Sequence, residues 1–223
     1  MTLCMTKGAV RSENETKRTV PIDSLGGCRN VDTPEKQILL DKDIREPLFD
    51  FLEENYGRVR ILEEKTTGRA RADVVMITGE KLYGIEIKSD ADTYARIKKQ
   101  VRYYDMYYDR NMVVVGSSHG AHISEHVPKH WGIITVEPLD DGSIDFYILR
   151  EPQDNPKVKD DRKISILWRL ELNHLLQLND LPRYSRKSKA FVQQVLLERV
   201  DHAILWKQAC DELFERDYTT IDH

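Results

Sequence analysis

Cysteine and long apolar runs are both scarce in this chain of 223 residues. Cys4, Cys28 and Cys210 lie far apart and show no CxxC spacing. We therefore expect neither a disulfide framework nor a cysteine-bound zinc, and a reducing, cytoplasmic compartment is favoured. No stretch of about 18 apolar residues is present, so no membrane-spanning helix is predicted. The N-terminal segment also lacks the apolar stretch of a secretory signal.

Neither sign of charge dominates the composition. The chain has 34 Lys and Arg against 38 Asp and Glu, a formal net charge of −4. This balance neither indicates nor excludes a nucleic-acid partner, because phosphate contacts depend on local clusters of basic residues. With 40% hydrophobic and 32% charged residues, the composition is that of an ordinary globular protein.

Apolar periodicity divides the chain into three parts. Residues 1–36 are polar and lack periodicity, which predicts a flexible leader. Residues 37–159 alternate between helix and strand patterns and form the predicted core. Residues 160–223 carry three helical patterns, at 164–179, 188–200 and 201–216, which predict a helical C-terminal subdomain in which Asp201 caps the last helix.

The predicted core has a definite order of elements. An apolar stripe predicts a helix over 42–56, and Ser89-Asp90 is a candidate N-cap for a second long helix. A short helix is expected near 121–127, before Pro128. Strands are predicted at 59–64, 73–77, 82–88, 112–116, 131–137 and 145–150. This order predicts an α/β fold in which helices flank a mixed central sheet.

Three ionisable residues interrupt two otherwise apolar strands in ADVVMITGEKLYGIEIKSD, residues 72–90. Glu86 and Lys88 share one strand face, and a hairpin can set Asp73 beside Glu86. Two close carboxylates repel each other unless a cation lies between them, and Mg²⁺ or Mn²⁺ prefers oxygen ligands. Lys88 could then activate water or stabilise charge on phosphorus. An exposed salt pair between Glu86 and Lys88 is the plainer alternative.

The element order and these charges resemble the PD-(D/E)XK nuclease superfamily. Asp73, followed 13 residues later by Glu86-Ile87-Lys88, resembles its metal-binding signature, although Ala72 stands where the motif's name has Pro. The resemblance covers residues 42–150 approximately and implies a restriction-endonuclease-like αβββαβ core. Within that superfamily, RADVVMI and YGIEIKSDADTYARIKKQVRYYD look most like a group of bacterial and phage proteins without an assigned role.

The resemblance also implies roles for particular residues. Asp73, Glu86 and the backbone carbonyl of Ile87 would bind Mg²⁺ or Mn²⁺, and Lys88 would act on the nucleophilic water. A further carboxylate from the first helix would be Glu46, with Glu53 as the competitor. Gln100 and Tyr104 match a Gln and an aromatic residue one turn apart on the following helix.

Basic residues supply candidate contacts to nucleic acid, with DNA the expected substrate. A solvated helix face is the alternative for those on the second helix. The tyrosines of that helix could stack on bases, but their helical spacing favours core packing for most of them. A solvated connector is the alternative for the cluster RYSRKSK at 183–189. The candidates are Arg71, Arg96, Arg102, Tyr104, Arg183, Arg186 and Lys187.

Two other functions compete with a nuclease. HISEH at 122–126 fits the H-x-x-E-H pattern of one zinc-peptidase group, with His122 and His126 as ligands; surface histidines are the plainer interpretation. A nucleic-acid-binding or regulatory protein without turnover is the second alternative. The leading hypothesis is a cytoplasmic, metal-dependent phosphodiester hydrolase, and a homodimer remains open.

Overall fold

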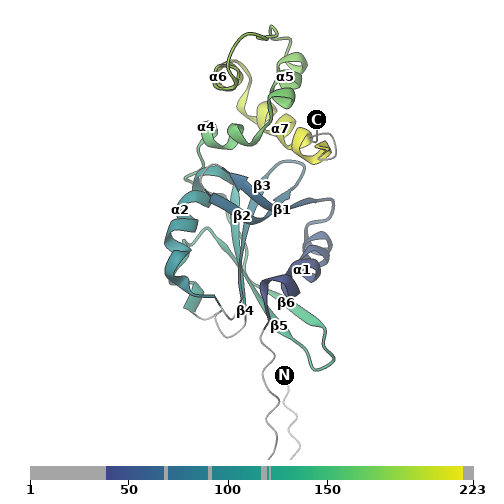
Figure 1. Cartoon of the computed structure of the whole chain (residues 1–223), viewed down its shortest axis with the longest axis vertical. Helices are drawn as coiled ribbons and strands as arrows, with labels where there is room; N and C mark the ends of the chain where they lie inside the picture. Colours follow the sequence, from purple (N-terminus) through teal and green to yellow (C-terminus); the bar gives the residue numbers. More distant parts are fainter. Residues whose placement is uncertain (1–38, 68–69, 90–91, 117–119, 121, 218–223) are drawn as a thin grey trace, which may run out of the picture. The chain divides into compact units, whose positions relative to one another are not determined.

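In the computed structural model, six strands form one mixed sheet in which each strand lies beside its neighbours in the sequence (Figure 1). The structure describes residues 39–67, 70–89, 92–116, 120 and 122–217. The antiparallel pairs are β1/β2, β2/β3 and β5/β6, and the pairs β3/β4 and β4/β5 are parallel. The strands are β1 (Arg60–Thr67), β2 (Ala70–Ile77), β3 (Leu82–Lys88), β4 (Arg110–Gly116), β5 (Gly132–Pro138) and β6 (Ile144–Arg150).

Helix α1 (Asp41–Tyr56) packs on one face of the sheet. Its buried residues Ile44, Leu48 and Leu52 recur every four positions, so they form a single apolar stripe along the helix. They share a hydrophobic cluster with the strand residues Val74, Met76, Tyr83, Ile85, Ile87, Met112, Val114, Ile134 and Val136. The helix ends at Gly57, whose φ of 71° is readily adopted only by glycine.

Helix α2 (Ile97–Tyr107) covers the opposite face, preceded by the short helix η1 (Tyr94–Arg96). Figure 1 shows α1 and α2 on the two sides of the sheet. Tyr104, Tyr107 and Tyr108 are buried in the cluster on this face, which confirms core packing for these tyrosines. Strand β4 is buried from Asn111 to Gly116, as its continuous apolar run predicts for a strand covered on both faces.

The C-terminal helices extend the hydrophobic cluster on the α2 face. Leu172, Leu196 and Leu213 belong to the same cluster as Tyr104 and Val113, so the sheet and these helices share one core. The elements are α4 (Asp160–Lys163), η2 (Ile164–Ile166), α5 (Arg169–Leu178), α6 (Lys189–Arg199) and α7 (His202–Glu215). None of the described helices is long and apolar enough to cross a membrane.

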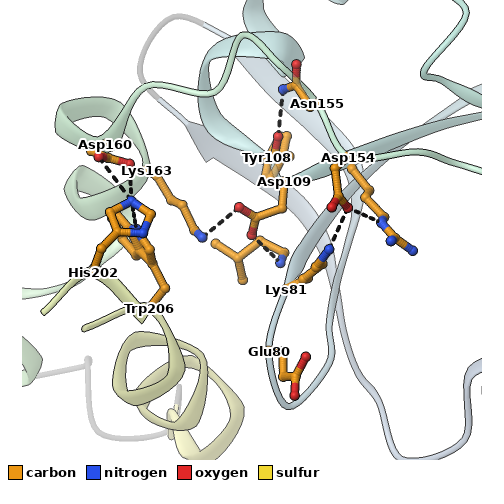
Figure 2. Close-up of polar contacts among 12 residues, drawn as sticks. Glu80, Lys81, Tyr108, Asp109, Asp154, Asn155, Asp160, Lys163, His202 and Trp206 are labelled. Carbon is orange, nitrogen blue, oxygen red and sulfur yellow. Dashed lines mark hydrogen bonds and ion pairs between the residues drawn. The ribbon is translucent and has the colours of Figure 1, made fainter. Parts of the chain in front are cut away.

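A partly buried ion pair joins Lys163 of α4 to Asp109, the residue just before β4 (Figure 2). The Lys163 ammonium contacts Asp109 Oδ1 at 2.7 Å and lies 4.1 Å from the centre of the Trp206 ring. The second oxygen of Asp109 accepts the backbone N–H of Leu82, the first residue of β3, at 2.8 Å. Asp109 therefore ties α4 to the start of β3.

Two predicted helices differ from the observed ones. The helix expected from Ser89-Asp90 begins at Ile97 instead: the Asp92 carboxylate accepts both the N–H and the hydroxyl of Ser89, which closes a local turn. The helix predicted at 164–179 is interrupted, because Trp168 is extended and its N–H donates to Glu171 in a new helix cap. By contrast, the predicted cap is confirmed at Asp201, which accepts two N–H groups of α7.

A third helix, predicted near 121–127, is not formed over that range, because residues 124–126 turn after Ile123. The remaining predicted strands and helices match observed elements to within a few residues, and a turn at Asp141-Gly142 joins β5 to β6. The chain is therefore a mixed α/β protein with a six-stranded mixed sheet. The predicted leader, residues 1–36, lies outside the described residues. The boundary between core and helical subdomain stays a prediction.

Candidate active site

The regular pairing of β2 with β3 ends just before the predicted acidic pair. The register runs from Ile77↔Leu82 to Val74↔Ile85, and its continuation would set Asp73 opposite Glu86. Instead, the N–H of Ile87 donates to Asp73 Oδ2 at 2.9 Å. Because N–H and C=O of one residue point to the same side of a strand, the Ile87 carbonyl faces this gap. A carboxylate thus takes the place of the next ladder bond.

Glu86 is almost completely buried, at 1% exposure, and Lys88 is 6% exposed. Three donors meet the Glu86 carboxylate: the Lys88 ammonium and the Gln100 amide contact Oε1, and the Tyr104 hydroxyl donates to Oε2 at 2.8 Å. A buried carboxylate is tolerated only when it is paired and hydrogen-bonded in this way. The alternative of an exposed salt pair is therefore wrong, because the pair lies inside the protein.

Helix α2 reaches the site because β3 has a glycine where the helix crosses it. A Cβ atom on Gly84 would lie 2.3 Å from Tyr108 Cδ2 and 2.7 Å from Tyr104 Cδ1, so only glycine allows this approach. The Tyr104 hydroxyl then also accepts the Asp73 N–H, at 3.3 Å. Sequence reasoning missed this role, although an isolated glycine inside a strand indicates close approach of another element.

The ionisation of Asp73 is perturbed by its surroundings. Burial, reinforced by the negative charge of Glu86, raises the pKa of Asp73 from 3.8 to about 7, against the opposing effects of the Ile87 N–H and the Lys88 ammonium. An ionised Asp73 beside Glu86 is therefore unfavourable in the absence of a further positive charge.

A hydrated hard cation fits this donor set. No three His, Cys, Asp or Glu side chains gather into a metal site within the described residues. Mg²⁺, however, keeps several waters and is commonly held by one or two carboxylates. Among the described residues, the buried Oε1 atom of Gln100 has no hydrogen-bond partner, so it can accept a hydrogen bond from a cation-bound water beside Glu86. Asp73, Glu86 and the Ile87 carbonyl can supply the protein oxygens.

The structure does not bring Glu46 to this cluster. Glu46 and Glu53 are both exposed, and helical geometry sets them away from the buried stripe of α1. Sequence reasoning also missed Arg45, which donates to the Asp73 backbone carbonyl at 3.2 Å and to Asp41 at 2.8 Å. Asp41 is the α1 carboxylate whose negative charge helps to raise the pKa of Asp73.

The candidate nucleic-acid contacts have different locations. Arg96 and Arg102 are exposed on η1 and α2, and Arg183, Arg186 and Lys187 are exposed between α5 and α6. The side chain of Arg71 lies outside the described residues. Tyr104 is 1% exposed, and its ring packs against Tyr108 and Trp131. Tyr104 therefore orients Glu86 and cannot stack on a base.

The HISEH segment does not present its histidines as a pair of ligands. Only His122 and Ile123 of this segment are helical, and residues 124–126 form a turn. The ring of His126 lies against Tyr94, with centroids 4.6 Å apart, and His122 is exposed. Because the segment turns after Ile123, the two histidines do not share the i, i+4 helix face that zinc ligation needs.

Together, the fold and the site define a mixed α/β protein with a buried acid–lysine cluster at the end of a strand pair. A family model described as "Bacteriophage P4 protein cII" matches residues 34–222. The chain therefore belongs to the bacteriophage P4 protein cII family. Comparisons with curated proteins and with solved structures found no match.

Proposed function

We propose that this protein is a metal-dependent nuclease of the PD-(D/E)XK type that hydrolyses phosphodiester bonds in DNA. The observation that carries the proposal is the meeting of Asp73, Glu86 and Lys88 where the β2–β3 ladder ends. The element order α1-β1-β2-β3-α2-β4, with α1 and α2 on opposite faces, supports a restriction-endonuclease-like core. The family description names a phage protein and carries no activity.

Each residue of the cluster has a role in the proposed reaction. Asp73, Glu86 and the Ile87 carbonyl would hold Mg²⁺ or Mn²⁺. The bound cation would polarise the phosphate and lower the pKa of an attacking water. Lys88 would orient that water and stabilise the negative charge that develops on the phosphate oxygens. Water adds to phosphorus while one P–O ester bond breaks, and the leaving oxygen takes up a proton.

Helix α2 would keep the cluster in its reactive geometry. The Tyr104 hydroxyl and the Gln100 amide fix both oxygens of Glu86, so the carboxylate cannot rotate away from Asp73. The unpartnered Gln100 Oε1 would accept a hydrogen bond from water at the site. These two residues act by positioning, and Lys88 is the group that would touch the reacting atoms.

A cleavage panel tests this proposal. Single-stranded, duplex and branched DNA and RNA are incubated with wild type in Mg²⁺, Mn²⁺ or EDTA. We expect cation-dependent cleavage of DNA that falls by about 100-fold or more in Glu86→Gln and Lys88→Ala, the scale of losing one preorganised charged group. Glu46→Gln and Lys42→Ala, exposed on α1, are the matched controls and should retain activity.

The same panel contains the results that contradict a nuclease. Equal cleavage by wild type and Glu86→Gln would assign the activity to a contaminant. Binding to DNA without turnover, at any cation concentration, would favour the non-catalytic nucleic-acid-binding alternative. Cleavage of RNA alone would change the substrate and keep the chemistry.

A further inference from the structure

A groove with basic walls lies along the flank of α2 that faces away from Gln100. It has a volume of about 710 Å³ and runs between α2 and the segment that precedes α4. Its apolar lining comes from Val101, Met106, Pro156 and Val158, and its charged lining from Lys98, Arg102, Asp105, Lys157 and Lys159.

The charges in this groove are largely uncompensated. Four cations face one carboxylate, a local formal charge of +3, in a chain whose net charge is −4. Within the described part of the chain, no carboxylate pairs with the side chains of Lys98, Arg102 or Lys159. Unpaired cations that converge on one groove are the electrostatic footprint of a polyanion site.

Asp105 offsets only one of these four positive charges, because it pairs with Lys157 and its other contacts lie on the buried side. Its Oδ1 contacts the Asn111 amide, the Trp131 indole N–H at 2.8 Å and His130 at 3.0 Å. Its Oδ2 contacts Lys157, at 3.2 Å. The carboxylate is 4% exposed, so it serves as a buried anchor for the groove wall rather than as a surface charge.

Helix geometry connects this groove to the carboxylate site. At about 100° per residue, Lys98 and Arg102 lie roughly 160° around α2 from Gln100. Lys99, which is exposed, and Tyr103, which is half-buried, occupy the solvent side between them. A helix with its side chains is about 10–12 Å across. A single nucleic-acid strand could therefore run from the groove over Lys99 and Tyr103 toward the catalytic carboxylates.

We propose that the groove lined by Lys98, Arg102, Lys157 and Lys159 binds the phosphate backbone of the nucleic-acid substrate next to the active site. The choice of nucleic acid as the polyanion rests on the proposed nuclease function. The apolar floor suits sugars and bases, and the cations along both walls suit successive phosphates. Lys98 and Arg102, one helical turn apart, form the wall contributed by α2.

Binding in EDTA tests the groove separately from catalysis. Fluorescence anisotropy follows labelled single-stranded and duplex DNA across a salt series. The test variant is Lys98→Gln/Arg102→Gln, with Lys159→Gln for the opposite wall. The matched control, Lys42→Gln/Arg199→Gln, removes two exposed charges that lie on α1 and α6. Circular dichroism and the unfolding midpoint verify that each variant is folded.

The counterion relation sets the expected size of the effect. Loss of two phosphate contacts should reduce the salt slope by about 1.4–1.8 and weaken binding about 10- to 30-fold near 0.15 M salt. Lys159→Gln should weaken binding about 4- to 6-fold, and the control pair should change it less than about 2-fold. These losses would support the groove even if wild type cleaved nothing.

Three results would overturn the groove as a nucleic-acid site. One is an unchanged salt slope in the folded double variant. Another is an equal loss of affinity in the control pair, which would reduce the effect to overall charge. The third is competition by polyglutamate as effective as competition by unlabelled DNA, which would identify an acidic protein as the occupant.

Discussion

Replacing Asp73 by Asn should stabilise the cation-free protein at alkaline pH. The pKa of Asp73 is raised from 3.8 to about 7 by burial and by the neighbouring Glu86 charge. Between these two values the folded state retains a proton that the unfolded state has lost. Because the unfolded state binds fewer protons there, the free energy of unfolding falls as pH rises from about 4 to about 7.

The magnitude follows from the size of that interval. About three pH units at roughly 1.4 kcal/mol each give an upper bound of about 4 kcal/mol. Solvent relaxation around the partly exposed carboxylate reduces this, so we expect a difference of about 2 kcal/mol at pH 8. In a chain of this length that corresponds to an unfolding midpoint raised by about 4–8 °C. The Asn side chain can still accept the Ile87 N–H, so that hydrogen bond remains.

The assay is the difference in unfolding free energy between wild type and Asp73→Asn, measured in EDTA from pH 4 to pH 8. Other titrating groups are the same in both proteins, so the difference isolates this site. Asp50→Asn, on an exposed carboxylate of α1, is the control. A gap between wild type and Asp73→Asn that stays constant over the whole pH range would refute the carboxylate repulsion.

Adding Mn²⁺ extends the same experiment to the cation. Ligand that binds only the folded state raises stability by RT ln(1 + [L]/Kd). Mn²⁺ should therefore raise the midpoint of wild type at pH 8, where Asp73 is ionised, and raise that of Asp73→Asn much less. An equal effect of Mn²⁺ on both proteins would place the cation elsewhere.

Three further changes test the packing around the site. Gly84→Ala should destabilise the protein by about 1–3 kcal/mol, seen in denaturant unfolding, because the new methyl group meets the tyrosine rings of α2. Lys163→Met should lower the unfolding free energy by about 3 kcal/mol by leaving Asp109 without its cation, and a double change with Asp109→Asn should recover part of that loss. Cys210 is buried with its pKa raised to about 12, so in a chain without the other two cysteines it should react with a thiol reagent only after unfolding; rapid reaction of the folded protein would contradict its burial.

Much of the fold could be predicted because its elements carry strong local patterns. Ile44 and Leu48 mark α1 by helical spacing, and the apolar run before Gly116 marks a strand covered on both faces. The predicted starts of two helices failed where a side chain captured a backbone N–H locally. Asp92 binds the N–H of Ser89, and Glu171 binds that of Trp168. Such competition between a cap and a turn depends on geometry that spacing alone does not specify.

The carboxylate site was predictable in part for the same reason. Strand alternation sets Glu86 and Lys88 on one face, and the hairpin sets Asp73 nearby. To predict which acidic residue of α1 approaches the site, one needs to know how the helix is rotated about its axis. The observed rotation buries Ile44 and turns Glu46 toward solvent. Periodicity identifies the buried stripe of a helix, but it does not show which end of the helix approaches the site.

The break in the β2–β3 ladder affects both the stability of this protein and its proposed chemistry. A continued ladder would pair Ile87 with Ala72 and leave no room for a carboxylate between the strands. The break gives the Ile87 N–H to Asp73 and the Asp73 N–H to Tyr104, so the backbone groups stay satisfied while a gap opens. The gap gathers negative charge that Lys88 offsets only in part, since the pKa of Asp73 remains raised. The proposed divalent cation would supply the positive charge that this gap lacks.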